Sequence, residues 1–222
     1  MMTLTEMAVD VLTTPDGREK TAKSHRHAKT WFDAKESGIT IEIGNASPPE
    51  NPARPDAPEL LPPHKVPKRK SGSTKGRIAL LHAIAHIELN AVDLHWDIIP
   101  RFAHIKMPKG YFDDWVKAAD EESKHFNLLC DRLEDMGSFY GALPAHAGMW
   151  RSAAETADDF MGRLAIVPMV LEARGLDVTP GMISLFKKVE DQPTVDALEI
   201  IDADELGHVA YGSQVVQFLC VR

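Results

Sequence analysis

Two stretches share one pattern: ADEESKHF (residues 119–126) and DADELGHV (residues 202–209). Each contains a glutamate followed three residues later by a histidine, Glu122 with His125 and Glu205 with His208. On an α-helix, positions i and i+3 lie about 60° apart, so both side chains of a pair can face one metal ion. We therefore expect both stretches to be helical and both pairs to supply metal ligands.

A single glutamate precedes each pair at nearly the same distance. Glu88 lies 34 residues before Glu122, and Glu172 lies 33 residues before Glu205. Both Glu88 and Glu172 sit in otherwise apolar stretches, where a buried carboxylate without a partner would be costly. The sequence therefore reads as two copies of a helix pair, each contributing one Glu and then Glu-x-x-His.

This ligand set is that of two-metal carboxylate proteins built on helix bundles. Two divalent cations would balance four ionised carboxylates in a core. Oxygen ligands with one imidazole per metal favour iron or manganese, and the lack of thiolates argues against a zinc knuckle. We predict two transition-metal ions, most simply iron with manganese as the alternative, bound by Glu88, Glu122, His125, Glu172, Glu205 and His208.

Three further residues are candidates for supporting these ligands. An acid directly precedes each Glu of the Glu-x-x-His pairs, Glu121 in one case and Asp204 in the other. Both are natural acceptors for the N–H groups of ligand imidazoles. His95 lies seven residues after Glu88 on the same helix face, as a neighbour of the ligands, a third nitrogen ligand or an ordinary core or surface histidine.

Other histidines and tyrosines carry weaker signals. His82 and His86 are four residues apart, like a zinc pair, but point well away from Glu88, so we favour a structural role over metal binding. Tyr211, three residues after His208, is the tyrosine placed to meet the predicted site, and packing is its simpler role.

The second part of the chain is expected to be an all-α four-helix bundle, residues 77–222. Apolar residues recur there at helical spacing and strand-like alternation is rare. The expected helices are Ile78–Phe102, Tyr111–Met136, Ala154–Gly175 and Pro193–Cys220. Pro168 is expected to kink the third run, and Met182–Val189 to form a short helix before the fourth.

The first part is expected to be an irregular N-terminal arm over residues 1–76. It combines a polar helix, an extended proline-rich segment and a basic linker (Asp16–Ser37, Ser47–Pro67 and Lys65–Arg77). Trp31 and Phe32 are the expected anchors of the polar helix. Proline forbids continuous helix or central strand in the middle segment. The basic segment lacks interleaved aromatic residues, so we read it as a solvated linker, with binding of RNA or an acidic partner as the minority reading.

Bulk properties narrow the class of protein. A net charge of −8 over 222 residues argues against nucleic-acid binding by the whole surface. Two cysteines ninety residues apart, Cys130 and Cys220, form no disulfide framework, and we expect reduced thiols. Apolar runs are too short for a membrane span, and Met1–Asp10 lacks a basic leader. We expect a cytoplasmic protein.

Four longer stretches carry a resemblance: residues 80–97, 119–150, 163–182 and 202–213. Over about residues 55–222 the sequence resembles the bacterial ferritin-like family known as domain of unknown function 455. The resemblance implies a ferritin-like fold with a di-metal site at the six residues named above, but no established reaction. YGALPAHAGMW (residues 140–150) matches a family signature. Relatives are expected to continue past Cys220, where this chain is about to end.

Three functions are compatible with such a site. The first is a di-iron oxidoreductase that activates O2 or peroxide to hydroxylate or oxidise an organic substrate, either a small molecule or one carried on nucleic acid, with an electron donor if it is an oxygenase. The second is an iron-handling ferroxidase or store. The third is a non-catalytic bundle in which the metals only staple the helices. The fold is also compatible with a homodimer.

Overall fold

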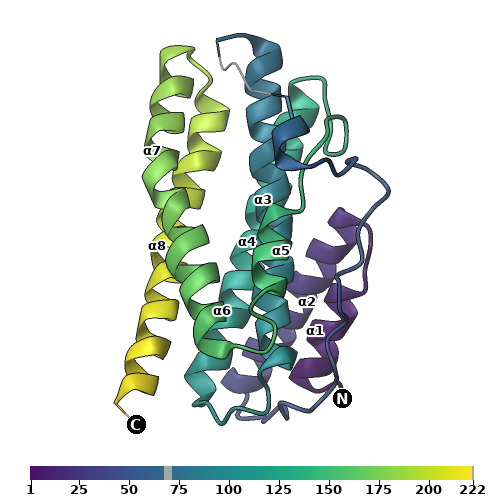
Figure 1. Cartoon of the computed structure of the whole chain (residues 1–222), viewed down its shortest axis with the longest axis vertical. Helices are drawn as coiled ribbons and strands as arrows, with labels where there is room; N and C mark the ends of the chain where they lie inside the picture. Colours follow the sequence, from purple (N-terminus) through teal and green to yellow (C-terminus); the bar gives the residue numbers. More distant parts are fainter. Residues whose placement is uncertain (68–71, 222) are drawn as a thin grey trace. The chain divides into compact units, whose positions relative to one another are not determined.

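The computed structural model describes residues 1–67 and 72–221, and these residues are mostly helical (Figure 1). They form no strand, and an isolated bridge between extended segments joins Leu60 to Ala145. The predicted all-α class is therefore confirmed. Residues 68–71, which belong to the predicted basic linker, lie outside the described residues. None of the described helices is long and apolar enough to cross a bilayer.

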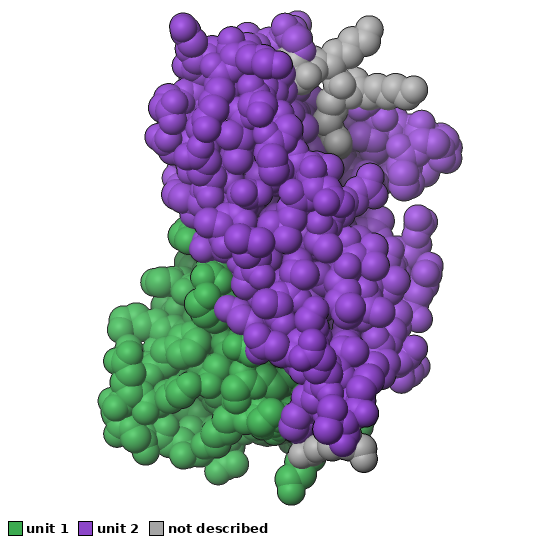
Figure 2. Space-filling model, turned by 90° about the vertical axis from the view of Figure 1, so that its left-hand side faces the viewer, with its two compact units in different colours: residues 1–55, 89–124 green, residues 56–88, 125–222 purple. Residues whose placement is uncertain are grey.

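Two compact units divide the chain (Figure 2). Unit 1 consists of Met1–Pro55 and Leu89–Lys124, and unit 2 of Asp56–Glu88 and His125–Arg222. Helices α3 (Thr74–Arg101) and α4 (Lys109–Asp135) are each continuous in the chain and contribute a segment to both units. Both match the predicted helices Ile78–Phe102 and Tyr111–Met136 to within a few residues. The predicted division at residues 76 and 77 stays a prediction.

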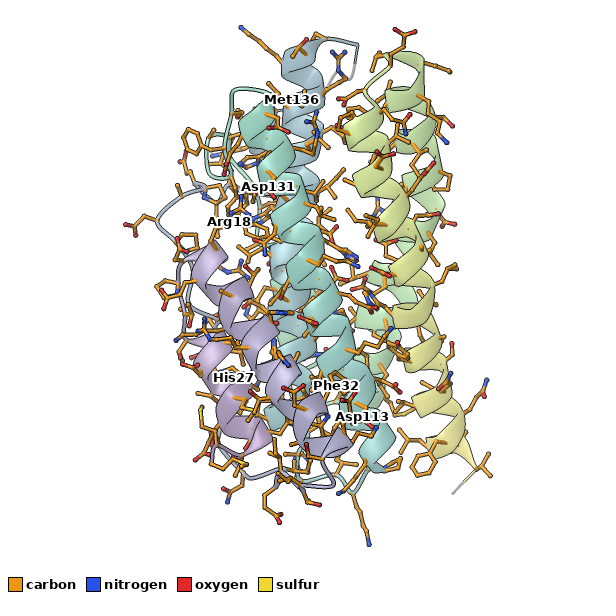
Figure 3. The ribbon with its side chains drawn as sticks, turned by 180° about the vertical axis from the view of Figure 1, so that it is seen from behind. Arg18, His27, Phe32, Asp113, Asp131 and Met136 are labelled. Carbon is orange, nitrogen blue, oxygen red and sulfur yellow. The ribbon has the colours of Figure 1, made fainter. Side chains whose placement is uncertain are left out.

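Unit 1 begins with helices α1 (Leu4–Leu12) and α2 (Gly17–Glu36). Helix α2 starts where the Asp16 side chain accepts a hydrogen bond from the backbone N–H of Glu19, at 2.8 Å. Such a cap satisfies one of the free N–H groups of the first turn. The predicted polar helix is confirmed, and Trp31 is buried in it. Phe32 is partly exposed and lies near the end of α2 (Figure 3).

Buried polar contacts hold α2 against α3 in unit 1. The Lys20 ammonium lies 2.5 Å from the Asp93 carboxylate, and both side chains are only 1 % exposed. Lys20 also donates to the carbonyl oxygen of Ala53, in the proline-rich segment, at 2.9 Å. The Trp96 indole N–H donates to the Ser24 hydroxyl at 2.8 Å. These pairings satisfy polar groups that would otherwise be costly to bury.

The proline-rich segment Ser47–Pro67 is extended, as predicted. Within it one short turn of 3-10 helix, η1 (Pro63–Lys65), interrupts the irregular backbone. The segment is tied down by backbone contacts, including the Ala53 N–H donating to the carbonyl oxygen of Leu12 at 2.7 Å.

Unit 2 contains the remaining helices: α5 (Gly148–Ala154), α6 (Phe160–Ile166), the π-helix η2 (Val167–Glu172), α7 (Ala173–Lys188) and α8 (Gln192–Cys220). The expected helix Pro193–Cys220 is confirmed as α8. The expected run Ala154–Gly175 is wrong at both ends. It starts later because the Asp159 side chain caps a new helix by accepting from the Gly162 N–H at 2.9 Å. It continues through Pro180, so the expected short helix Met182–Val189 is largely the end of α7.

Candidate metal centre

The structure brings five of the six predicted ligands into two buried groups. Glu88, Glu122 and His125 form one group, and Glu122, Glu172 and His208 form the other. Within each group, one potential ligand atom per residue lies within 4.8 Å of the others. Glu122 is common to both. Among the described residues no other cluster of three or more acidic, histidine or cysteine side chains reaches this spacing.

These side chains come from helices whose sequences place them on buried faces. Glu88 is on α3, Glu122 and His125 are one turn apart on α4, and Glu172 ends the π-helix η2. His208 is on α8, one turn after Glu205. All six predicted residues are at most 7 % exposed. Burial of four carboxylates in apolar helices is costly unless cations balance them.

His125 is held between two carboxylates. Its Nδ1 lies 3.3 Å from Glu88 Oε2, and its Nε2 lies 3.0 Å from Asp204 Oδ2. A carboxylate that accepts the N–H on one imidazole nitrogen fixes the tautomer and leaves the other nitrogen for a metal. With Nε2–H donated to Asp204, Nδ1 would face the metal side. This is the arrangement expected for Asp204 as a neighbour of the ligands.

His208 lies opposite Glu172 in the second half of the chain, as His125 lies opposite Glu88. Its Nδ1 lies 4.0 Å from Glu172 Oε2, and its ring centroid lies 6.2 Å from that of His125. In both halves the histidine of Glu-x-x-His therefore faces the single glutamate supplied by the preceding long helical segment. The repetition expected from the 34- and 33-residue spacings is seen in these two glutamate–histidine pairs, but Glu205 does not take the place that Glu122 has in the first group.

The π-helix η2 delivers Glu172. A π-turn closes its hydrogen bond one residue further along than an α-turn, and such turns are frequent at functional sites. Pro168, predicted to kink this run, lies within η2 and packs against Gly212 of α8. A Cβ at residue 212 would lie 2.5 Å from Pro168 Cγ, so this close approach requires glycine. Sequence reasoning located the distortion but not its type.

Glu205 is buried but belongs to neither three-residue group. Its carboxylate lies against the backbone of Gly175 on α7, where a Cβ would stand 2.3 Å from Oε2 and 2.5 Å from Oε1. Glu205 thus fills space that any side chain at residue 175 would take. Sequence reasoning missed Gly175, although a glycine three residues after Glu172 inside an apolar helix was a usable signal.

The other predicted neighbours of the ligands have different surroundings. Glu121 forms an ion pair with Lys117, one turn earlier on α4, at 2.8 Å. His95 is fully buried, and its ring centroid lies 5.5 Å from that of Trp115. The expectation that these two residues support the metal ligands stays a prediction. Tyr211 lies with its ring centroid 6.3 Å from that of His208.

His82 and His86 hold a loop. The Nε2 of His82 accepts the backbone N–H of Gly141 at 2.9 Å. His86 Nδ1 lies 2.8 Å from the Tyr140 hydroxyl, and its Nε2 lies 3.1 Å from the carbonyl oxygen of His146. The Tyr140 ring stacks on His82 with centroids 5.4 Å apart. The YGALPAHAGMW stretch is therefore anchored to α3 by these two histidines, which gives it a structural role.

The donor set is compatible with metal binding. Carboxylate oxygens outnumber imidazole nitrogens in it. The two cysteines of the chain, Cys130 and Cys220, are free thiols and belong to neither group.

Comparisons with known proteins identify a family and a relative of this chain, and neither description states a reaction. A family model described as "Protein of unknown function (DUF455)" matches residues 13–222. An uncharacterized protein of Haemophilus influenzae is 45 % identical over 166 residues, which cover 72 % of this chain and 58 % of that protein. The chain thus spans somewhat over half the length of this relative. No solved structure matches the chain described here.

Proposed function

Because the chain belongs to the DUF455 family, whose description assigns no activity, we propose a function from the site itself: a ferritin-like, di-iron or di-manganese carboxylate oxidoreductase. It activates O2 or peroxide to hydroxylate or oxidise an organic substrate. We also propose that the helices of residues 77–222 are arranged as a ferritin-like bundle.

The sharing of Glu122 carries this proposal. Two three-residue groups that have a carboxylate in common are suited to two metal ions bridged by that carboxylate. Within each group the ligand atoms lie within 4.8 Å of one another, so each group could surround one ion. A single structural ion would use only one of the two groups.

The residues of the site have distinct tasks in this proposal. Glu88 and His125 would hold one metal, and Glu172 and His208 the other, with Glu122 between them. Glu205, one turn before His208, is the counterpart of Glu122 in the second half of the chain and would be the fourth carboxylate ligand. Asp204 would keep the Nε2 proton of His125 in place, so that its other nitrogen stays a ligand.

Bound iron would supply the electrons that reduce dioxygen or peroxide. The chain's contribution is to orient the ligands and to exclude water. The six predicted ligands are all at most 7 % exposed, and apolar residues such as Leu89 and Phe126 are buried beside them along the same helices. A dry, preorganised environment strengthens the electrostatic action of bound ions and limits side reactions.

Oxygen uptake after anaerobic loading with Fe(II) tests the proposal. We expect the reduced protein to consume O2 within seconds, with a change in its visible spectrum. Iron that binds firmly yet leaves O2 untouched would favour the stapled bundle. Uptake accompanied by accumulation of Fe(III) well beyond two ions per chain would favour an iron-handling ferroxidase.

A further inference from the structure

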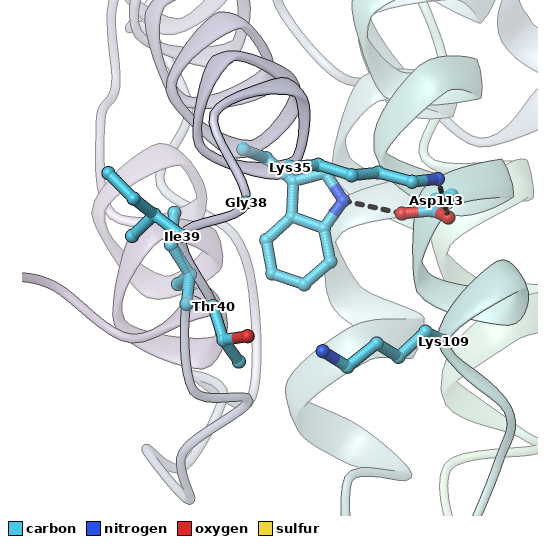
Figure 4. Close-up of a pocket in the computed structure, with 8 residues that line it drawn as sticks. Lys35, Gly38, Ile39, Thr40, Lys109 and Asp113 are labelled. Carbon is cyan, nitrogen blue, oxygen red and sulfur yellow. Dashed lines mark hydrogen bonds and ion pairs between the residues drawn. The ribbon is translucent and has the colours of Figure 1, made fainter.

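Unit 1 contains a pocket of about 150 Å³ at the end of α2 (Figure 4). It is bounded by α2, by the segment that follows α2 and by the first turns of α4. The residues that line it are Trp31, Lys35, Gly38, Ile39, Thr40, Ile41, Lys109 and Asp113. None of them is a predicted metal ligand.

One side of the pocket is fixed by a hydrogen-bonded network. The Trp31 indole N–H donates to Asp113 Oδ1 at 2.8 Å, and the Lys35 ammonium donates to Asp113 Oδ2 at 2.5 Å. Both carboxylate oxygens of Asp113 are therefore engaged within the protein. Because its charge is already compensated, this acid offers little to a cationic ligand.

The remaining polar groups of the pocket favour an anion. Lys35 and Lys109 carry two positive charges against the single negative charge of Asp113. Lys35 uses one of its three N–H donors in the hydrogen bond to Asp113, which leaves two for a ligand, and the Thr40 hydroxyl can also donate. Figure 4 shows Lys35 extending to Asp113, and Lys109 extending from the start of α4 toward the segment that holds Thr40.

The rest of the lining is apolar. Trp31 and Ile41 are buried and form the apolar base, while Ile39 is about half exposed at the rim. Gly38 adopts a φ of 72°, and a Cβ there would meet nothing within 4 Å, so this rim is open. A cavity volume of about 150 Å³ is limited. The occupant must be small.

We propose that this pocket binds a small organic carboxylate with an apolar aromatic or branched body. The carboxylate pairs with the Lys109 ammonium and takes a hydrogen bond from the Thr40 hydroxyl. The apolar body packs against Trp31 and Ile41, where an aromatic ring gains offset or edge-to-face contacts with the indole. The proposal stands on unit 1 alone and does not depend on the metal centre.

Titration of the full chain with sodium benzoate tests this assignment. ¹H–¹⁵N NMR spectra would follow the indole N–H of Trp31, which lines the pocket and is hydrogen-bonded at its wall. We expect saturable shifts with benzoate and none with benzamide, its neutral isostere. Lys109→Gln should weaken benzoate binding about tenfold, the scale of one charge-assisted hydrogen bond. Lys109→Arg, which keeps the charge, should restore most of the affinity.

Lys106→Gln is the matched control. It also removes one positive charge, three residues before Lys109, but the Lys106 side chain does not line the pocket. Its affinity for benzoate should equal that of the unmodified chain. Equal weakening by Lys106→Gln and Lys109→Gln, equal binding of benzamide and benzoate, or shifts that do not saturate would each overturn the proposal.

Discussion

The Cα of Gly175 faces the carboxylate of Glu205 so closely that a Cβ at residue 175 would lie 2.3 Å from Glu205 Oε2. Helices α7 and α8 thus meet at a glycine and a buried acid. We predict that Gly175→Ala displaces Glu205 and lowers metal content, measured by elemental analysis of the purified protein.

Gly181→Ala on the same helix is the control for that substitution, because a Cβ at residue 181 would meet nothing within 4 Å. Alanine is the better helix former by about 1 kcal/mol, so this variant should keep its metal and melt no lower than the unmodified chain. Full metal content in Gly175→Ala would contradict the role assigned to the contact between Gly175 and Glu205.

Asp204 should matter through His125. Removing the acceptor in Asp204→Ala frees the imidazole to rotate and to change tautomer, and loss of such a partner typically weakens metal affinity by about 10- to 100-fold. Competition with a metal chelator measures this affinity. Asp202→Ala, on the same helix and likewise partly exposed, should leave the affinity unchanged. Equal affinities in the two variants would contradict the contact's proposed role.

The buried pair Lys20–Asp93 should stabilise unit 1 only as a pair. Lys20→Met leaves the Asp93 carboxylate buried and should cost about 3–5 kcal/mol in the free energy of unfolding. Lys20→Met combined with Asp93→Leu should recover most of that loss. Lys29→Met, which breaks an exposed pair with Asp33, should change the free energy of unfolding far less in the same denaturant titration, because solvent screens that pair.

The pH dependence of the Lys20→Met variant has a definite sign. Burial raises the pKa of the Asp93 carboxyl, while Lys20 and then Arg54 act in the opposite direction. Without Lys20 the pKa must rise further, so the folded variant binds more protons than its unfolded chain. Its stability deficit should therefore be smallest in acid, where the Asp93 carboxyl is neutral in both folded proteins, and should grow as the pH rises through the raised pKa of Asp93 in the unmodified chain. A deficit independent of pH would show that Asp93 is not the group left unbalanced.

Much of the helical architecture follows from local pattern. The N-terminal caps of α2 and α8 are supplied by the residues directly before them, Asp16 before Gly17 and Asp191 before Gln192. The metal-centre grouping was predictable in part: the spacing singled out Glu88, Glu122 and His125, which form one group, but its counterpart of Glu122, Glu205, belongs to neither group. Helical periodicity then restricts which faces these side chains occupy.

Other features depend on contacts between distant segments. The close contact at Gly175 exists only because α8 brings the Glu205 carboxylate to α7. The role of His86 depends on Tyr140, 54 residues away, and the small-carboxylate pocket depends on the pairing of Trp31 with Asp113, 82 residues apart. The π-turn at η2 shifts hydrogen-bond register, which a proline signals only as a distortion.

Substituting His125 separates an enzyme from a stapled fold. A catalytic metal keeps an exchangeable position, so His125→Ala should slow O2 uptake far more than it lowers the melting temperature. A structural metal contributes its binding energy to folding, and losing a ligand then costs stability first. Melting and O2 uptake should be recorded on one sample. A large drop in melting temperature, with an unmodified chain inert to oxygen, would defeat the enzyme proposal.

Metal stoichiometry tests the central claim most directly. The purified chain, reconstituted with Fe(II) under anaerobic conditions and freed of excess ions, should contain close to two metal ions per chain. Glu122→Ala should lower that number most, because Glu122 belongs to both ligand groups, and Glu205→Ala should lower it as well. Two ions retained in the Glu122→Ala, Glu205→Ala double variant, or no ion bound by the unmodified chain, would contradict the two-metal site.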